Sequence, residues 1–250
     1  MAGHNKWSQI KRKKGVNDQA RGRVFAKIGR ELAVAARDGG GDPNFNPRLR
    51  LAVDNARAQN MPKDNIERAI KRGTGDLPGT TFEEITYEGY APGGIALYLQ
   101  CLTDNANRTV AELRHLLDKR GGNLGQAGSV AWMFERLGQI YLDADACDEE
   151  SALEAALEAG ADNFEAEDGV FVVTTAPADL HEVQKALRDA GLPIQETEVA
   201  MVPTNMVKVE GRKAEKLVGL LDAIDEHEDV QRVYSNADLD DADLAVLETS

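Results

Sequence analysis

The chain has 250 residues, of which 42% are hydrophobic, 29% are charged and only 5% are aromatic. This length accommodates two or three globular domains; no apolar run approaches the ~20 residues of a membrane-spanning helix, and the N-terminal sequence is not that expected of a secretory signal. Cys101 and Cys147 lack metal-ligand spacing, which argues against structural zinc and favours a reducing compartment. We therefore expect a cytoplasmic protein without membrane contact.

The formal net charge of −14 is distributed unevenly along the chain. Residues 1–80 contain 17 Lys and Arg against 8 Asp and Glu, whereas residues 81–250 contain 12 against 35. A division of this size indicates that the basic part binds a polyanion, while the acidic remainder limits non-specific binding. The alternative is a solvated basic surface without a partner.

The first 80 residues predict three short helices. Asp18 is a suitable cap for a helix that runs to about Asp38 and ends at Gly39–Gly41. Asn46 before a proline starts a second helix, and a third starts at Pro62 and ends at Gly73. Apolar residues recur along one face of each helix, as in a small bundle.

Beyond a linker at residues 74–81, the pattern changes to alternating strands and helices. We predict strand, strand, helix and strand at 85–90, 95–103, 107–120 and 130–135. A βαββαβ run follows, which is typical of a ferredoxin-like unit, at 139–143, 149–159, 163–166, 170–175, 179–190 and 196–202. Last come a strand, a helix and a strand at 206–209, 213–226 and 230–234, which would complete the interrupted ββαβ unit.

The predicted fold class is an α+β multidomain protein with an N-terminal three-helix domain and two ferredoxin-like α+β domains, one inserted in the other. The expected domains are a basic helical domain at 1–79, a discontinuous α+β domain at 80–136 plus 204–238, an inserted ferredoxin-like domain at 137–203, and an acidic tail at 239–250. We expect this tail to be mobile.

Two groups of basic residues are candidates for nucleic-acid binding, because Lys and Arg release condensed counterions when they contact phosphates. The first group lies in the N-terminal arm and includes an aromatic residue able to stack on a base or to pack on the first helix: Lys6, Trp7, Lys11, Arg12, Lys13, Lys14, Arg21 and Arg23. The second group lies on the predicted helices: Lys27, Arg30, Arg37, Arg48, Arg50, Arg57, Lys63, Arg68, Lys71 and Arg72. Two of these, Lys71 and Arg72, also suit a helix C-terminus, where cations stabilise the helix dipole.

Catalysis has little support in the sequence. The four histidines lie in different predicted elements, and no nucleophile accompanies a base. The segment Asp104–Thr109 is typical of a helix cap, and the glycine-rich segment Gly121–Ser129 fails the Walker pattern, so it is either a contact loop or a loop with several positive-φ positions. We expect no catalytic residues, no metal site and no cofactor, and hence a protein that is not an enzyme.

Several long motifs resemble the YebC/PmpR family, namely residues 3–7, 35–43, 46–50, 60–73, 87–90 and 103–109. The resemblance implies a three-domain fold with a helical N-terminal domain and two α+β domains. Members of this family are described as transcriptional regulators that bind promoter DNA. Others, including a mitochondrial translational activator, are described as acting on translation at the ribosome.

Three functions remain open at this point. The first is a regulator of gene expression that binds promoter DNA, and its alternative is a translation factor that binds ribosomal RNA or the ribosome through the same basic helices. The third is a protein–protein adaptor that acts through the acidic α+β domains.

Overall fold

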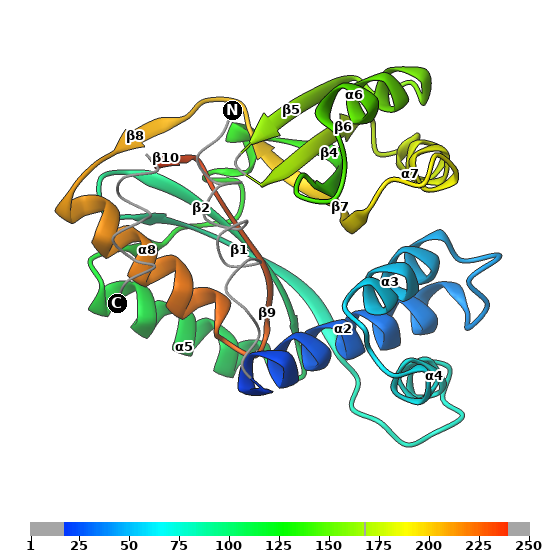
Figure 1. The fold of residues 1–250 in the computed structure, drawn as a ribbon. Helices are drawn as coiled ribbons and strands as arrows, with labels where there is room; N and C mark the ends of the chain where they lie inside the picture. Colours follow the sequence, from blue (N-terminus) through cyan, green and yellow to red (C-terminus); the bar gives the residue numbers. More distant parts are fainter. Residues whose placement is uncertain (1–17, 168, 240–250) are drawn as a thin grey trace. The chain divides into compact units, whose positions relative to one another are not determined.

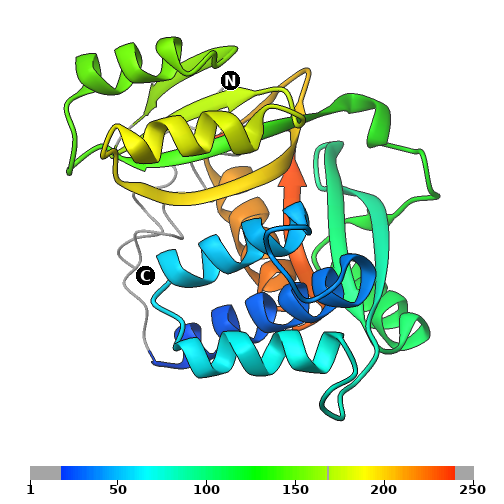
Figure 2. The same ribbon diagram turned by 90° about the vertical axis from the view of Figure 1, so that its right-hand side faces the viewer.

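The computed structural model describes residues 18–167 and 169–239 and shows an α+β multidomain chain, as predicted (Figures 1 and 2). Within this range the chain divides into two compact units. The first unit contains residues 18–34, 79–135 and 203–239, and the second contains residues 35–78 and 136–202.

The first unit is built on a four-stranded sheet in the order β3-β1-β2-β9, and its core lies between this sheet and the helices α5 and α8. Its elements are β1 (Glu83–Ala91), β2 (Ile95–Thr103), α5 (Ala106–Lys119), β3 (Asn123–Leu124), α8 (Arg212–Asp225) and β9 (Val230–Ser235). Leu97 and Leu99 of β2 are fully buried in this core. Tyr98 lies on the opposite face of the strand, because successive side chains of a strand alternate between its two faces. The centroid of its ring is 5.9 Å from that of Phe134.

One predicted strand of the first unit is wrong. Residues Ala131–Met133 form a short 3-10 helix, and β4 (Phe134–Asp143) begins only after it. The carboxylate of Glu88 accepts hydrogen bonds from the backbone N–H groups of Val130 and Ala131, at 2.7 and 2.8 Å. These bonds hold the chain in a turn, so the sheet edge is supplied by the two-residue β3 instead.

The C-terminal segment differs from the prediction in one more respect. The predicted strand at 206–209 forms as β8 (Val207–Val209), but it pairs in parallel with β10 (Ala237–Leu239) rather than with the main sheet. Leu239, predicted to begin a mobile tail, is 1% exposed, because it packs into the core of the first unit. Residues 240–250 lie outside the described residues.

The second unit contains a four-stranded sheet in the order β5-β6-β4-β7, which is the ferredoxin-like order predicted for this segment. Its remaining elements are α3 (Pro47–Ala58), α4 (Lys63–Gly73), α6 (Glu149–Glu158), β5 (Asn163–Glu167), β6 (Val170–Thr175), α7 (Leu180–Asp189) and β7 (Ile194–Pro203). The end of α2 (Asp18–Gly39) also belongs to this unit. The core of the sheet and its two helices is aliphatic, with Ile140, Leu142 and Leu187 fully buried.

Helix α3 packs against this ferredoxin-like sheet. Leu51 contacts its aliphatic core. The side-chain amide of Asn55 donates to the carbonyl of Thr197 at 2.7 Å and accepts the backbone N–H of Thr197 at 3.1 Å. Arg188 of α7 forms an ion pair with Asp54 at 3.1 Å. These contacts fix the position of α3 against the sheet.

Candidate nucleic-acid interface

Asn46 fixes the corner between α2 and α3. Its side-chain oxygen accepts a hydrogen bond from the N–H of Leu49 at 3.0 Å and so caps α3. Its amide nitrogen donates to the carbonyls of Ala35 and Gly40, at 2.7 and 2.8 Å. A Cβ on Gly39 would lie 2.6 Å from this amide, so only glycine fits at that position.

Arg50 is one of the predicted phosphate ligands. In the structure its guanidinium binds backbone carbonyls of the loop between α2 and α3. Its Nε donates to the carbonyl of Pro43 at 2.9 Å, and one Nη donates to the carbonyl of Asn44 at 2.7 Å. The other Nη lies 2.7 Å from Nε2 of His181. The loop that it holds exposes the ring of Phe45, whose 86% exposure is not that of a core residue.

Helix α4 carries cations on its outer face. Ile66 and Ala69 are buried on the inner face, and the four-residue connection from α3 is set by Asn60, which adopts a positive φ of 56°. Three of the predicted cations are exposed on α4 and form no ion pair with any residue that the structure describes: Arg68, Lys71 and Arg72. They are free to contact an anionic partner.

Two further predicted cations, Arg57 in the last turn of α3 and Lys63 at the start of α4, have only weak ion pairs. The Lys63 side chain is 86% exposed and lies 3.6 Å from Glu67. The Arg57 side chain is 73% exposed and lies 3.9 Å from Asp54. Exposed pairs of this kind contribute little to stability, so both cations can exchange their partners for phosphates.

The predicted cations of α2 other than Arg21, together with Arg48 at the start of α3, have partners within their own units. Arg23 and Lys27 form ion pairs with Glu226 and Asp225, at 3.3 and 2.9 Å. In the second unit Arg37 and Arg48 share Asp38, at 2.8 and 3.7 Å. These pairs favour a structural contribution.

Arg21 is exposed and has no ion pair among the described residues. The remaining predicted site residues, Lys6, Trp7, Lys11, Arg12, Lys13 and Lys14, lie outside the described residues.

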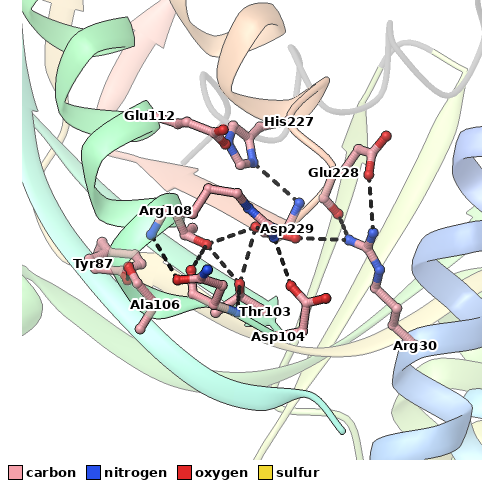
Figure 3. A network of polar contacts seen from close by, with 12 residues as sticks. Arg30, Tyr87, Thr103, Asp104, Ala106, Arg108, Glu112, His227, Glu228 and Asp229 are labelled. Carbon is pink, nitrogen blue, oxygen red and sulfur yellow. Dashed lines mark hydrogen bonds and ion pairs between the residues drawn. The ribbon is translucent and has the colours of Figure 1, made fainter. Parts of the chain in front are cut away.

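Arg30 belongs to a polar network around Asp229, shown in Figure 3. Asp229 is only 3% exposed and accepts hydrogen bonds from Arg108 at 2.8 Å and from Thr109 at 2.7 Å. Burial acts to raise the pKa of Asp229, but the hydrogen bonds from Arg108 and Thr109 outweigh it and hold that pKa below its ordinary value. The predicted helix cap at this point is present, since Asn105 accepts the N–H of Arg108 at 3.1 Å.

The glycine-rich loop is fixed by Glu88, a residue to which the sequence pattern gave no weight. Its carboxylate accepts the N–H groups of Gly128, Val130 and Ala131 within 2.8 Å. Burial acts to raise the pKa of Glu88, but these three backbone bonds lower it below the ordinary value. The 3-10 helix that follows the loop carries Trp132, whose 71% exposure could not be expected from its apolar neighbours in the sequence.

Both cysteines are free thiols, and Cys101 is buried. Burial, followed by the charge of Asp229, raises the pKa of the Cys101 thiol to about 12. Burial also raises the pKa of Cys147. Among the described residues there is no group of three His, Cys, Asp or Glu arranged to hold a metal ion, and none of the helices described has the length and apolarity to cross a membrane.

These features define an α+β multidomain protein with a ferredoxin-like sheet and a short cationic helix on its surface. The chain belongs to the TACO1/YebC family: residues 5–76 match the family's N-terminal domain, and residues 82–237 match its second and third domains. The resemblance to the YebC/PmpR family is thereby confirmed.

Relatives match over the full length. A "probable transcriptional regulatory protein" of Acidithiobacillus ferrooxidans is 55% identical over 250 residues, which is 100% of both chains. One of Geobacter sulfurreducens with the same description is 52% identical over 247 residues, or 99% of this chain and 100% of the relative. The crystal structure of a conserved hypothetical protein from Aquifex aeolicus has a TM-score of 0.88 at 45% identity and covers 94% of this chain and 98% of its own.

Proposed function

We propose that the protein is a non-enzymatic regulator of gene expression that binds the phosphate backbone of nucleic acid. The observation that carries the proposal is the outer face of α4, where Arg68, Lys71 and Arg72 are exposed without an ion pair in the described part of the chain. The names of the relatives, probable transcriptional regulatory proteins, support a regulatory function and favour promoter DNA as the target.

The spacing of these three cations suits a polymer of phosphates. Residues three and four apart lie on the same face of a helix, so Arg68, Lys71 and Arg72 form one short row. Arg57 and Lys63 extend this basic surface with weakly paired charges. Each phosphate that a cation neutralises releases counterions, which makes binding favourable and salt-dependent without any reading of bases.

Structured RNA is the second candidate target, and two exposed aromatic rings favour it. The rings of Phe45 and Trp132 are 86% and 71% exposed. Such rings suit unpaired bases, which are splayed out in RNA loops.

The test is a titration of the full chain with a mixed-sequence DNA duplex and with a structured RNA, at several salt concentrations. The proposal predicts binding to at least one of them, with log K falling linearly as log salt rises. No binding at low ionic strength, or binding that is insensitive to salt, would contradict it. Sedimentation of a lysate through a sucrose gradient separates the targets: comigration with ribosomes supports RNA, and sequence-selective retention of promoter fragments supports DNA.

A further inference from the structure

Helices α5 and α8 lie side by side and run in opposite directions in the first unit (Figure 1). His227, just after the end of α8, contacts Glu112 in α5 at 2.9 Å. Asp229, two residues further on, binds Arg108 in the first turn of α5 at 2.8 Å. The end of α8 therefore lies beside the start of α5, which places the end of α5 beside the start of α8.

Five cations lie at this end of the two antiparallel helices, in or just after the last turn of α5 and in the first turns of α8. All are exposed, and none forms an ion pair with any residue within the described ranges: Lys119, Arg120, Arg212, Lys213 and Lys216. We call these five residues the α5–α8 cluster. Two exposed carboxylates, Asp118 and Glu215, lie among them, so the cluster keeps an excess of positive charge.

The charge of this cluster stands out against its surroundings. Residues 81–250 contain only 12 Lys and Arg against 35 Asp and Glu, and five of the 12 lie in this one place. The cations of α5 and those of α8 are about 90 positions apart in the sequence. A count of charges along the chain therefore does not show them as a group within this acidic segment. Only the antiparallel packing of the two helices brings them together.

Helix stability does not explain the cations at the start of α8. Arg212 and Lys213 occupy its first turn, where the helix dipole disfavours positive charge. The N-cap is Gly211, which has no side chain to accept the free N–H groups of that turn. An anion would satisfy both the N–H groups and the cations, which is the arrangement that binds phosphate at helix N-termini.

We propose that the α5–α8 cluster is a second phosphate-binding surface for nucleic acid, carried by the first unit. This proposal takes from the proposed function only that the ligand is a nucleic acid. It does not depend on the cations of α4, which belongs to the second unit. A polymer that reaches both surfaces binds more tightly than either surface alone, because the second contact is made at high effective concentration.

Two double variants of the full chain test this surface: Lys119→Ala with Arg120→Ala, and Arg212→Ala with Lys213→Ala. The matched control is Arg136→Ala with Lys185→Ala, which removes the same charge from exposed cations that have no ion pair among the described residues. All three are titrated against a mixed-sequence DNA duplex and a structured RNA. Circular dichroism confirms that each is folded.

The expected result is a loss of affinity of at least about threefold in each double variant relative to the control, and a shallower salt slope by about 1–2, since each phosphate contact contributes about 0.9. Loss on the RNA alone or on the duplex alone identifies the polymer. Double variants that match the control on both probes overturn this inference, and wild-type binding in the same titration leaves the proposed function standing. A wild-type chain that binds neither probe overturns both.

Discussion

At the scale of single residues, Asp229 keeps its charge although it is almost fully buried. Arg108, Thr109 and Thr103 all donate to its Oδ2 within 3.2 Å, and Arg30 approaches its other oxygen at 3.4 Å. Such partners replace the water that the carboxylate loses on burial. The charge of Asp229 contributes to the raised pKa values of Tyr87 and Cys101. Asp104 shares Arg108 with it, and Nδ1 of His227 accepts its backbone N–H at 3.2 Å. Asp229 thereby ties α2, α5 and β9 together.

Replacing Asp229 by Asn should lower the free energy of unfolding by about 2–3 kcal/mol at neutral pH, because bonds to a charged group are lost. The folded-state pKa of Asp229 is lowered, so its contribution is present above the unfolded value of about 3.9 and is lost as the pH falls through the folded value. Urea denaturation should therefore show a gap between wild type and variant that narrows below about pH 4. A gap that stays constant with pH contradicts this assignment, and Asp64→Asn, at an exposed site, is the control.

Phe45 is an aromatic residue held out of the core by its own loop. Asp42 accepts the N–H of Asn44 at 2.9 Å. Arg50 donates to the carbonyls of Pro43 and Asn44, the two residues before Phe45. The ring is thus presented to solvent by a loop with little freedom to fold it inward.

If the loop that carries Phe45 binds unpaired nucleotides, Phe45→Ala should weaken binding to a single-stranded RNA by about 1–3 kcal/mol, the value of one stacked base. Binding to a DNA duplex should be unchanged, since its bases are already stacked on one another. Phe45→Tyr keeps the ring and serves as the control. Equal losses on the RNA and the duplex would rule out stacking.

At the scale of elements, the helices of the N-terminal segment were predictable because the residues that start and end each helix lie next to it in the sequence. Asn46 caps α3 as predicted, and α4 ends at Gly73 as predicted. The strand predicted at 130–135 was wrong because Glu88, more than 40 positions away in the sequence, decides the conformation there. Nor could the pattern show that β8 pairs with β10, since two three-residue strands leave no periodic signal.

Glu88→Gln should release the glycine-rich loop, because both carboxylate oxygens accept backbone N–H groups. The Gln amide keeps one uncharged acceptor oxygen, and its NH2 group can only donate. We expect faster amide hydrogen exchange at Gly128, Val130 and Ala131, with the rest of the first unit unchanged. Glu83→Gln, an exposed position on the same strand, is the control. Exchange rates in the loop equal to those of the control would show that Glu88 does not hold it.

At the scale of the whole molecule, charge segregation predicted the candidate interface only in part. The sequence counts Lys27 and Arg30 among the free cations, but Asp225 and Asp229, about 200 positions later, bind them in the folded chain. On α4, Glu67 lies 3.6 Å from Lys63, and the other three cations form no ion pair with the residues that the structure describes. The predicted domain boundaries stay a prediction, and the two compact units divide α2 after Val34.

The most direct measurement is the salt dependence of nucleic-acid binding by the full chain with Arg68, Lys71 and Arg72 replaced by Ala. A chain with Arg136, Lys185 and Lys208 replaced by Ala loses the same charge and is the control. We predict that the α4 variant binds more weakly than the control and has a log–log salt slope shallower by about 2–3, for three lost phosphate contacts. A slope equal to that of the control would contradict the assignment of α4 as the phosphate-binding surface.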